Sequence, residues 1–313
     1  AEMVDDSDPE TRIYYVERPT GTGIDARWKV GDEIEFLLRN TANQAQAVVG
    51  RVIGLHPGAG KENVARIETY VSGFNLNIPL TYYSVTGSGI VGTYNSWGSV
   101  RRLTKPKYFQ GGGNWDNPSA NYHLIKTNHV VNDRVVSGVG DITAYNNYLK
   151  QSVIQVASGN ASNGNYIFLR FRNIGSLFAL NINNTTNTDI EIKEITLESA
   201  TNWVYELNNA DNRYDPTPGT NAMTPGSVKS KSYQIFNYTG TTTNRFFNVA
   251  AGGTSSHYQW FMPSEGTAVS DLKVKVVFRN GTTKYINLNN VTFAREKRYK
   301  ITRTWNGSEF VKE

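Results

Sequence analysis

The segment DLKVKVVFRNGTTKYINL, residues 271–288, decides the fold class. Apolar and basic side chains alternate along its first half, with the apolar set at Leu272, Val274, Val276 and Phe278. A period of two is typical of a β-strand that has one buried and one solvated face. Asn280-Gly281 then predicts a two-residue type I′ turn, because both central residues of that turn have positive φ. The segment therefore predicts a β-hairpin.

The rest of the chain extends this prediction to an all-β protein with little helix. Strand-favouring Val, Tyr and Thr and turn-favouring Asn and Gly dominate over helix formers. The length of 313 residues exceeds the usual size of one hydrophobic core and predicts two domains. The chain contains no run of about 18 apolar residues, so its sequence predicts no membrane-spanning helix.

Charge and cysteine content exclude several classes of function. The chain has no cysteine, so disulfides, thiolate catalysis and thiolate metal sites are excluded. The net charge of +5 is spread along the chain without a basic block, so we expect no nucleic-acid partner. The first residue is Ala1, which fits a removed leader and equally an artificial boundary.

Strand patterns divide the chain into an acidic flexible tail (1–11), an N-terminal β-sandwich (12–155) and a C-terminal β-sandwich (160–313). A loop-like composition over residues 151–165 marks the boundary. In the first domain Ile34, Phe36 and Leu38 alternate as the inward side of a strand, and residues 64–71 predict another. In the second, strands are expected at 167–171, 178–182, 190–197 with a bulge, and 299–305.

Motifs of enzymes and metal sites are incomplete, so we expect no enzyme, cofactor or metal. Residues 54–62 resemble a phosphate loop, but the spacing is one residue too long and Glu62 replaces the Mg²⁺-binding Ser or Thr. The four histidines, His56, His123, His129 and His257, lack the spacing of a zinc motif. Asp211 and Asp215 fit a loop, although an opposed carboxylate pair would be needed for glycoside hydrolysis.

A glycine- and asparagine-rich stretch over 111–123 is the candidate ligand loop. It holds two aromatic residues, Trp115 and Tyr122, among side chains that can bond hydroxyl groups. Aromatic faces stack on sugars or on apolar partner groups. The alternative is that Trp115 folds back and covers the edge of the sandwich.

The order of motifs in the second half resembles the fimbrillin family of Bacteroidetes surface pilins. The family order of strand, polar turn, apolar strand and I-x-x-I-T-L strand is matched by 167–171, 172–176, 177–182 and 192–197. Phe261-Met262-Pro263, the hairpin and a closing strand that follows Phe293 continue the match. In the first half the resemblance is limited to Trp28-x-x-Gly31-Asp32. Glu296, where the family favours glycine, and Arg303, at an apolar position, depart from it.

The resemblance implies two successive sandwiches of transthyretin-like or Greek-key type. It also implies a lipid-anchored precursor on the outer membrane or in a fimbrium, and subunits joined by strand exchange. The candidate exchangeable strand is Ile13, Tyr14, Tyr15 and Val16, and Arg27 is the candidate processing site, because Arg18 precedes Pro19. The alternative is that this strand is a permanent part of the sandwich.

The resemblance does not decide which position the subunit takes in a fimbrium. The closing strand is followed by a turn and only a short segment, 305–311, so we expect a tip, cap, accessory or stand-alone adhesin-like protein rather than a stalk subunit. Such a protein would contact other pilus subunits and a host or glycan ligand. Two other classes compete: a glycan-binding sandwich of a polysaccharide-uptake system, with an ordered aromatic platform, and a glycoside-active enzyme, with two facing carboxylates.

Overall fold

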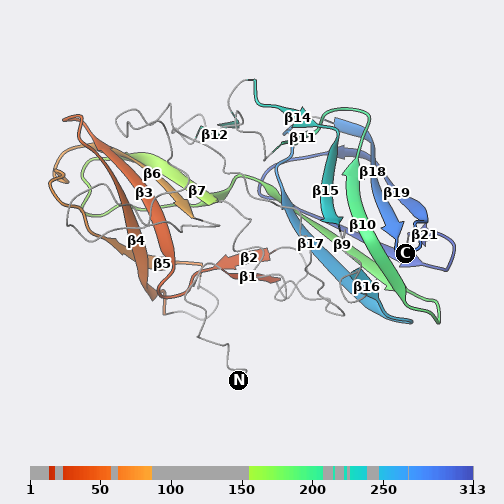
Figure 1. The fold of residues 1–313 in the computed structure, drawn as a ribbon. Helices are drawn as coiled ribbons and strands as arrows, with labels where there is room; N and C mark the ends of the chain where they lie inside the picture. The colour runs from red at the N-terminus through yellow and green to blue at the C-terminus, as the bar shows by residue number, and fades with distance from the viewer. Residues whose placement is uncertain are drawn as a thin grey trace. The chain divides into compact units, whose positions relative to one another are not determined.

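The computed structural model describes residues 14–17, 24–57, 63–86, 155–206, 214–215, 222–223, 226–237, 247–266 and 268–312. This part of the chain is all β-strand and turn, so it holds no helix that could cross a membrane. The chain divides into two compact units (Figure 1). The first holds β1–β8 with the short pair β12 and β13, and the second holds the other strands. The all-β prediction is confirmed.

The first unit is built on a six-stranded sheet in the order β5-β4-β3-β6-β7-β8. Its strands are β3 (Glu33–Asn40), β4 (Ala45–Leu55), β5 (Ala65–Thr69), β6 (Leu80–Thr86), β7 (Gln155–Ala161) and β8 (Arg172–Asn173). The ladders from β5 to β7 are antiparallel. Ile34, Phe36 and Leu38 are at most 5% exposed, as their alternation predicts.

Two sequence expectations are wrong at the junction of the units. β7 pairs along its whole length with β6, so the first unit extends to Arg172 and the boundary lies beyond 151–165. Residues 167–171 form no strand; they pack against the first sheet, where Phe171 meets Trp28 edge to face with ring centroids 5.4 Å apart. Alternation of apolar and polar residues indicates that one side of a segment is buried. A segment that packs on a sheet without pairing with one of its strands shows the same alternation.

The second unit contains two sheets. One has the order β15-β10-β18-β19, with β16 also on β10, and the other has the order β17-β9-β20-β21. The strands are β9 (Ser176–Asn184), β10 (Ile190–Glu198), β15 (Ser232–Asn237), β16 (Phe247–Val249), β17 (Thr254–Phe261), β18 (Ala268–Phe278), β19 (Thr283–Thr292), β20 (Arg298–Trp305) and β21 (Phe310–Val311). The short pair β11 (Val204–Tyr205) with β14 (Lys229–Ser230) completes the strands of this unit, whereas the pair β12 (Tyr214–Asp215) with β13 (Ala222–Met223) belongs to the first unit.

One hydrophobic core joins both sheets of the second unit, whose strands lie over one another as two layers (Figure 1). Alternate residues of β9, β10 and β18 supply it, including Leu180, Ile195 and Val274, each fully buried. β20 runs parallel to β9 along its whole length, whereas the other ladders of the unit are antiparallel. The unit is therefore a β-sandwich.

The hairpin of β18 and β19 is confirmed, but its turn is not the predicted one. Phe278 N donates to Thr282 O (2.9 Å), so three residues rather than two form the loop. Gly281 alone has positive φ in this loop, at 85°, which matches a type I turn followed by a left-handed residue. The bulge in β10 is confirmed, because the register against β18 shifts between Ile192 and Glu194.

Both departures from the fimbrillin pattern lie at unusual positions. Glu296 has a φ of 62°, in the left-handed region, and its N–H donates to Gly175 O at 2.9 Å. Arg303 stands opposite Ile182 in the β9–β20 register, is half-buried, and donates from Nη1 to the neighbouring carbonyl of Thr302 (2.7 Å). Glycine would suit position 296, because it adopts positive φ without a steric cost.

We expect Glu296→Gly to raise the free energy of unfolding by about 1 kcal/mol, because a left-handed conformation costs a non-glycine residue roughly that much. Urea denaturation of the purified chain measures the change. Glu296→Ala is the matched control, since it removes the carboxylate but keeps the Cβ, and it should give no gain. Equal stability of the two variants would contradict the prediction.

Candidate functional site: an N-terminal hairpin and its anchor

The candidate exchangeable strand lies in a two-stranded hairpin. β1 (Tyr14–Glu17) pairs antiparallel with β2 (Ile24–Arg27), and Tyr14 stands opposite Arg27. Among the described strands, the two pair with each other and with none of the larger sheets. The structure therefore brings the backbone of Tyr14, Tyr15 and Val16 beside the segment that ends in the candidate processing site, whereas Ile13 lies outside the described residues.

The chain is tied into the first sheet immediately after Arg27. Trp28 is 7% exposed and packs against Phe171. Lys29 N donates to the Asp32 carboxylate (2.7 Å), and Gly31 N donates to Val52 O (2.7 Å). Val52 N in turn donates to Asp32 O (2.9 Å). Gly31 has a φ of 96°, which glycine tolerates in this tight turn.

This geometry makes the Arg27–Trp28 peptide bond a boundary. On its C-terminal side the backbone is fixed by hydrogen bonds to β4 and by the buried Trp28 ring. On its N-terminal side the described backbone pairs within the hairpin. Hydrolysis of this one bond would separate β1 and β2 covalently from the first unit and leave the anchor in place.

The candidate ligand loop cannot be compared with the structure, because Trp115 and Tyr122 lie outside the described residues. The structure instead exposes two aromatic side chains, Phe168 within the segment that the sequence predicts as a strand and Tyr166 just before it. Tyr166 is 87% and Phe168 96% exposed. Their positions on the outward side of 167–171 were the available signal, since the inward side was read correctly.

No catalytic group emerges in the part of the chain that the structure describes. No group of three or more His, Asp or Glu side chains there could hold a metal ion. His56 lies on the surface, and His123, His129 and Asp211 lie outside the described residues. Asp215 belongs to the short strand β12, paired with β13, and not to the loop that the sequence predicts.

His257 is a structural histidine in the sandwich core. Its Nε2 lies 3.0 Å from Ile235 O, and the rings of Phe236 and Phe247 meet it edge to face, each with centroids 5.7 Å away. Burial lowers the pKa of His257 to about 4, although the hydrogen bond to Ile235 opposes this shift. The imidazole is therefore neutral near pH 7.

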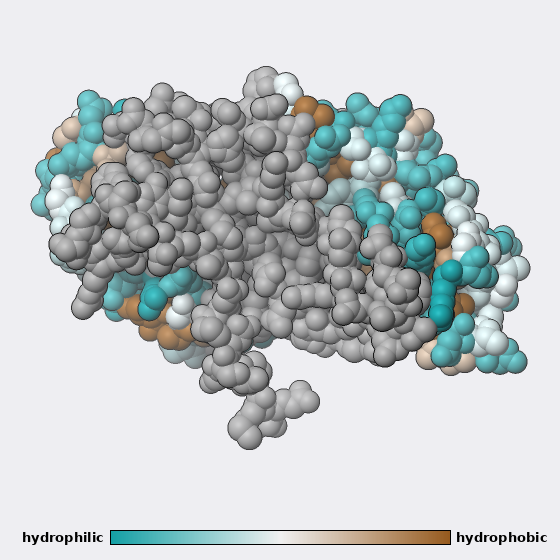
Figure 2. All heavy atoms as spheres, in the orientation of Figure 1, coloured by the Kyte–Doolittle hydropathy of each residue, from teal (hydrophilic) through white to brown (hydrophobic). Residues whose placement is uncertain are grey.

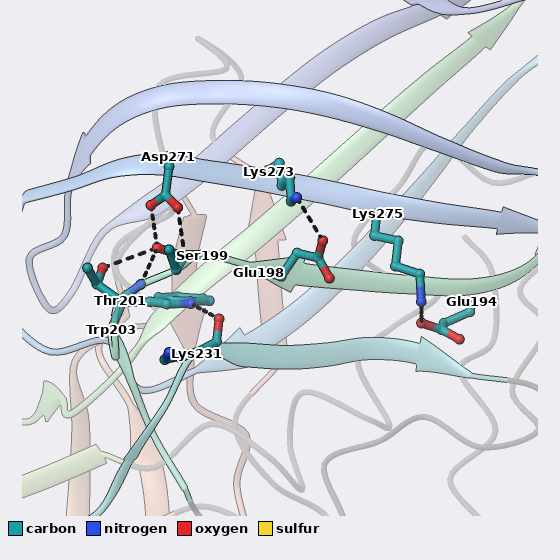
Figure 3. Close-up of polar contacts among 10 residues, drawn as sticks. Glu194, Glu198, Ser199, Thr201, Trp203, Lys231, Asp271, Lys273 and Lys275 are labelled. Carbon is teal, nitrogen blue, oxygen red and sulfur yellow. Dashed lines mark hydrogen bonds and ion pairs between the residues drawn. The ribbon is translucent and has the colours of Figure 1, made fainter.

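A polar network ties β18 to the end of β10 (Figure 3). The Asp271 carboxylate accepts hydrogen bonds from Ser199 Oγ (2.5 Å) and Ala200 N (2.7 Å), and the Ser199 bond is the main reason that the pKa of Asp271 is lowered. Trp203 Nε1 donates to Lys231 O (2.9 Å) beside it. These partners fix the β10–β11 connection and leave no arrangement typical of catalysis.

Ion pairs neutralise the outer face of the same sheet. Along β10 and β18 the pairs are Glu198–Lys273, Glu194–Lys275 and Glu191–Arg279, with N–O distances of 3.2, 3.0 and 2.8 Å. The bond to Glu194 raises the pKa of Lys275. The ring of Tyr285 is half-exposed, with Lys273 Nζ 4.7 Å from its centroid. Figure 2 shows teal and white with scattered brown on the described, visible part of the second unit, so no large apolar patch stands out there.

Comparisons with known proteins give structural likenesses only. No protein-family model matches the chain, and no curated protein matches its sequence. A candidate cell adhesion protein from Bacteroides ovatus is similar over 96% of this chain and 92% of its own, with 11% identity and a TM-score of 0.48. The fimbrial anchor protein Mfa2 from Porphyromonas gingivalis is similar over 93% and 87%, with 9% identity and a TM-score of 0.36.

The tip fimbrial protein Mfa3 from the same organism, with C-terminal truncation, is similar over 91% of this chain and 92% of its own, with 10% identity and a TM-score of 0.33. The proteins in these comparisons are thus cell-adhesion and fimbrial proteins by their names, which is the class that the motif order of the sequence resembles. Residue roles do not follow from it, because the identities are so low.

Proposed function

We propose that the protein is a fimbrial or adhesin-like subunit of the cell surface, in a tip, cap or accessory position, that joins other subunits through strand exchange. The order of motifs from β9 to β20 and the names of the similar structures support the class of protein, although the first motif of the resemblance, the strand at 167–171, is not a strand. We place it in a fimbrium or on the outer face of the outer membrane, with a lipid-anchored precursor.

The observation that carries the assembly step is the change in backbone pairing at Arg27. Residues 14–17 and 24–27 pair locally, whereas the backbone from Trp28 onward is fixed to the first sheet. Among the described strands the hairpin pairs with none of the larger sheets, so its release uncovers no ladder of those sheets. We infer that cleavage after Arg27 releases β1 and β2 together and that a strand of another subunit then pairs with a sheet edge that is already open, through its free N–H and C=O groups.

Digestion with an arginine-specific protease tests this proposal. We expect the wild-type chain to give a fragment that begins at Trp28 by mass spectrometry, and the digested sample to form higher oligomers by size-exclusion chromatography. Arg27→Gln should retain residues 14–27 and remain monomeric. Arg66→Gln, which removes an exposed arginine of β5, is the matched control and should behave as the wild type.

Two results would contradict the proposal. One is that Arg27→Gln assembles as well as the wild type after digestion. The other is that the wild-type chain, cut at Arg27, stays monomeric at every protein concentration tested. The first result would remove the role of Arg27, and the second would remove the link between cleavage and assembly.

A further inference from the structure

A stripe of four exposed side chains lies along one side of residues 166–172 in the first unit. Tyr166 is 87% and Phe168 96% exposed, and Arg170 and Arg172 are also exposed. The residues between them, Ile167, Leu169 and Phe171, are half-buried. Two aromatic rings are thus followed by two guanidinium groups, at every second position.

The backbone beneath the stripe is held from its inner side. Tyr82 Oη donates to Phe168 O at 3.2 Å, and Phe171 packs against the buried Trp28 ring. Just upstream, Gly164 N donates to Leu76 O at 2.7 Å. Because these contacts fix the segment without using the outward side chains, the two rings and two arginines are presented to a ligand with little backbone ordering still required.

The two rings are unusual as surface side chains. A single exposed apolar residue is ordinary, whereas adjacent exposed apolar groups mark interaction sites. In an extended chain, side chains at every second position lie about 7 Å apart on one side. Tyr166 and Phe168 can therefore offer two ring faces to successive units of an extended ligand.

The stretch of chain around the rings carries only positive charge. Residues 142–188 contain no Asp or Glu, and their basic residues are Lys150, Arg170 and Arg172. Within the described residues neither Arg170 nor Arg172 forms an ion pair, whereas arginines of the outer β18 face do, as Arg279 with Glu191 shows. Exposed guanidinium groups without a carboxylate bind carboxylate or sulfate groups readily.

We propose that the stripe Tyr166–Phe168–Arg170–Arg172 binds an acidic glycan chain, with sugar rings stacked on the two aromatic faces and carboxylate or sulfate groups paired with the two arginines. The ligand role is independent of strand exchange and of cleavage at Arg27. Nucleic acid fits less well, because two cations are few for a backbone with one charge per nucleotide. A peptide strand also fits less well, because such a strand needs a free backbone edge and Phe168 O is already bonded to Tyr82.

Binding of the full chain to immobilised glycans tests the proposal. The probes are polygalacturonate for carboxylate, heparin for sulfate, dextran as the neutral polymer and an oligothymidylate as a polyanion that would stack bases rather than sugar rings on the aromatic side chains. We expect an acidic glycan to bind more tightly than dextran and the oligothymidylate. The double variant Y166A/F168A should weaken this binding by roughly tenfold or more, the usual scale for loss of stacked rings.

Charge is tested separately with a matched pair of variants. R170Q/R172Q should remove the preference for acidic over neutral glycan, whereas K193Q/K300Q, which lowers the net charge equally at two exposed lysines of the second unit, should leave binding unchanged. Circular dichroism and thermal unfolding confirm that each variant is folded. The proposal is overturned if no acidic glycan binds, if the oligothymidylate or dextran binds equally well, or if K193Q/K300Q loses as much affinity as R170Q/R172Q.

Discussion

Gly175→Ala is expected to lower the free energy of unfolding by about 3 kcal/mol, the upper range for overpacking a core. A Cβ at Gly175 would lie 2.4 Å from Trp260 Cε2 and 2.5 Å from Phe261 O. Trp260 is 1% exposed, and Phe261 O belongs to the backbone, so neither neighbour can move easily. The glycine itself is fixed by the bond from Glu296 N to its carbonyl and lies next to Ser176, where β9 begins.

Gly54→Ala is the control for the general effect of adding a methyl group. A Cβ at Gly54 would meet no atom within 4 Å, and the φ of Gly54 is not in the left-handed region. The Gly54→Ala protein should therefore be about as stable as the wild type. Urea denaturation followed by tryptophan fluorescence measures both variants. If Gly175→Ala and Gly54→Ala unfold at the same urea concentration, the packing argument is refuted.

Acidification from pH 7 to pH 4 is expected to remove about 3 kcal/mol of stability through His257, since each unit of pKa shift corresponds to about 1.4 kcal/mol. The ordinary pKa of 6.5 applies to the unfolded chain, and the folded value is about 4. Between these values the unfolded chain binds the proton first, so the contribution is complete above pH 6.5 and lost toward pH 4. The lowered pKa of Asp271 acts at more acidic pH, because its ordinary value is 3.8.

Urea denaturation at several pH values separates this contribution from those of other groups. His257→Gln retains a donor for Ile235 O and should be less stable than the wild type at pH 7, but its stability should change little between pH 6.5 and pH 4. His56→Gln, at an exposed histidine, should keep the wild-type slope. A wild-type slope in His257→Gln would show that another group carries the pH dependence.

The strands with strict alternation were predictable because a buried face leaves its period in the sequence. Ile34, Phe36 and Leu38, and the apolar set of residues 271–288, follow this rule. The rule does not show whether a segment pairs with a neighbouring strand, so residues 167–171 were predicted to form a strand although they only pack against the sheet. It also does not give φ, so Asn280 was placed in a turn where Gly281 alone has positive φ.

The candidate site was predictable only in part. Tyr14, Tyr15 and Val16 are strong strand formers, and β1 contains them. Its partner β2 reads Ile-Asp-Ala-Arg, which alternates apolar and charged residues but is only four residues long and contains the weak strand formers Asp and Ala, so the sequence does not predict the pairing. The exposed rings of Tyr166 and Phe168 were predictable only in part, because the sequence pattern indicates which side of a segment faces outward but not whether that side is covered by another part of the chain.

The parallel pairing of β20 with β9 has a consequence for the time at which the second unit can fold. Contacts at the end of this pair join residues 120 positions apart, as between Thr185 and Trp305. Contacts so distant in sequence close slowly, and on the ribosome or during export they cannot form until almost the entire unit has emerged. β9, with both of its sheet neighbours still to come, has to remain unpaired on these edges until then.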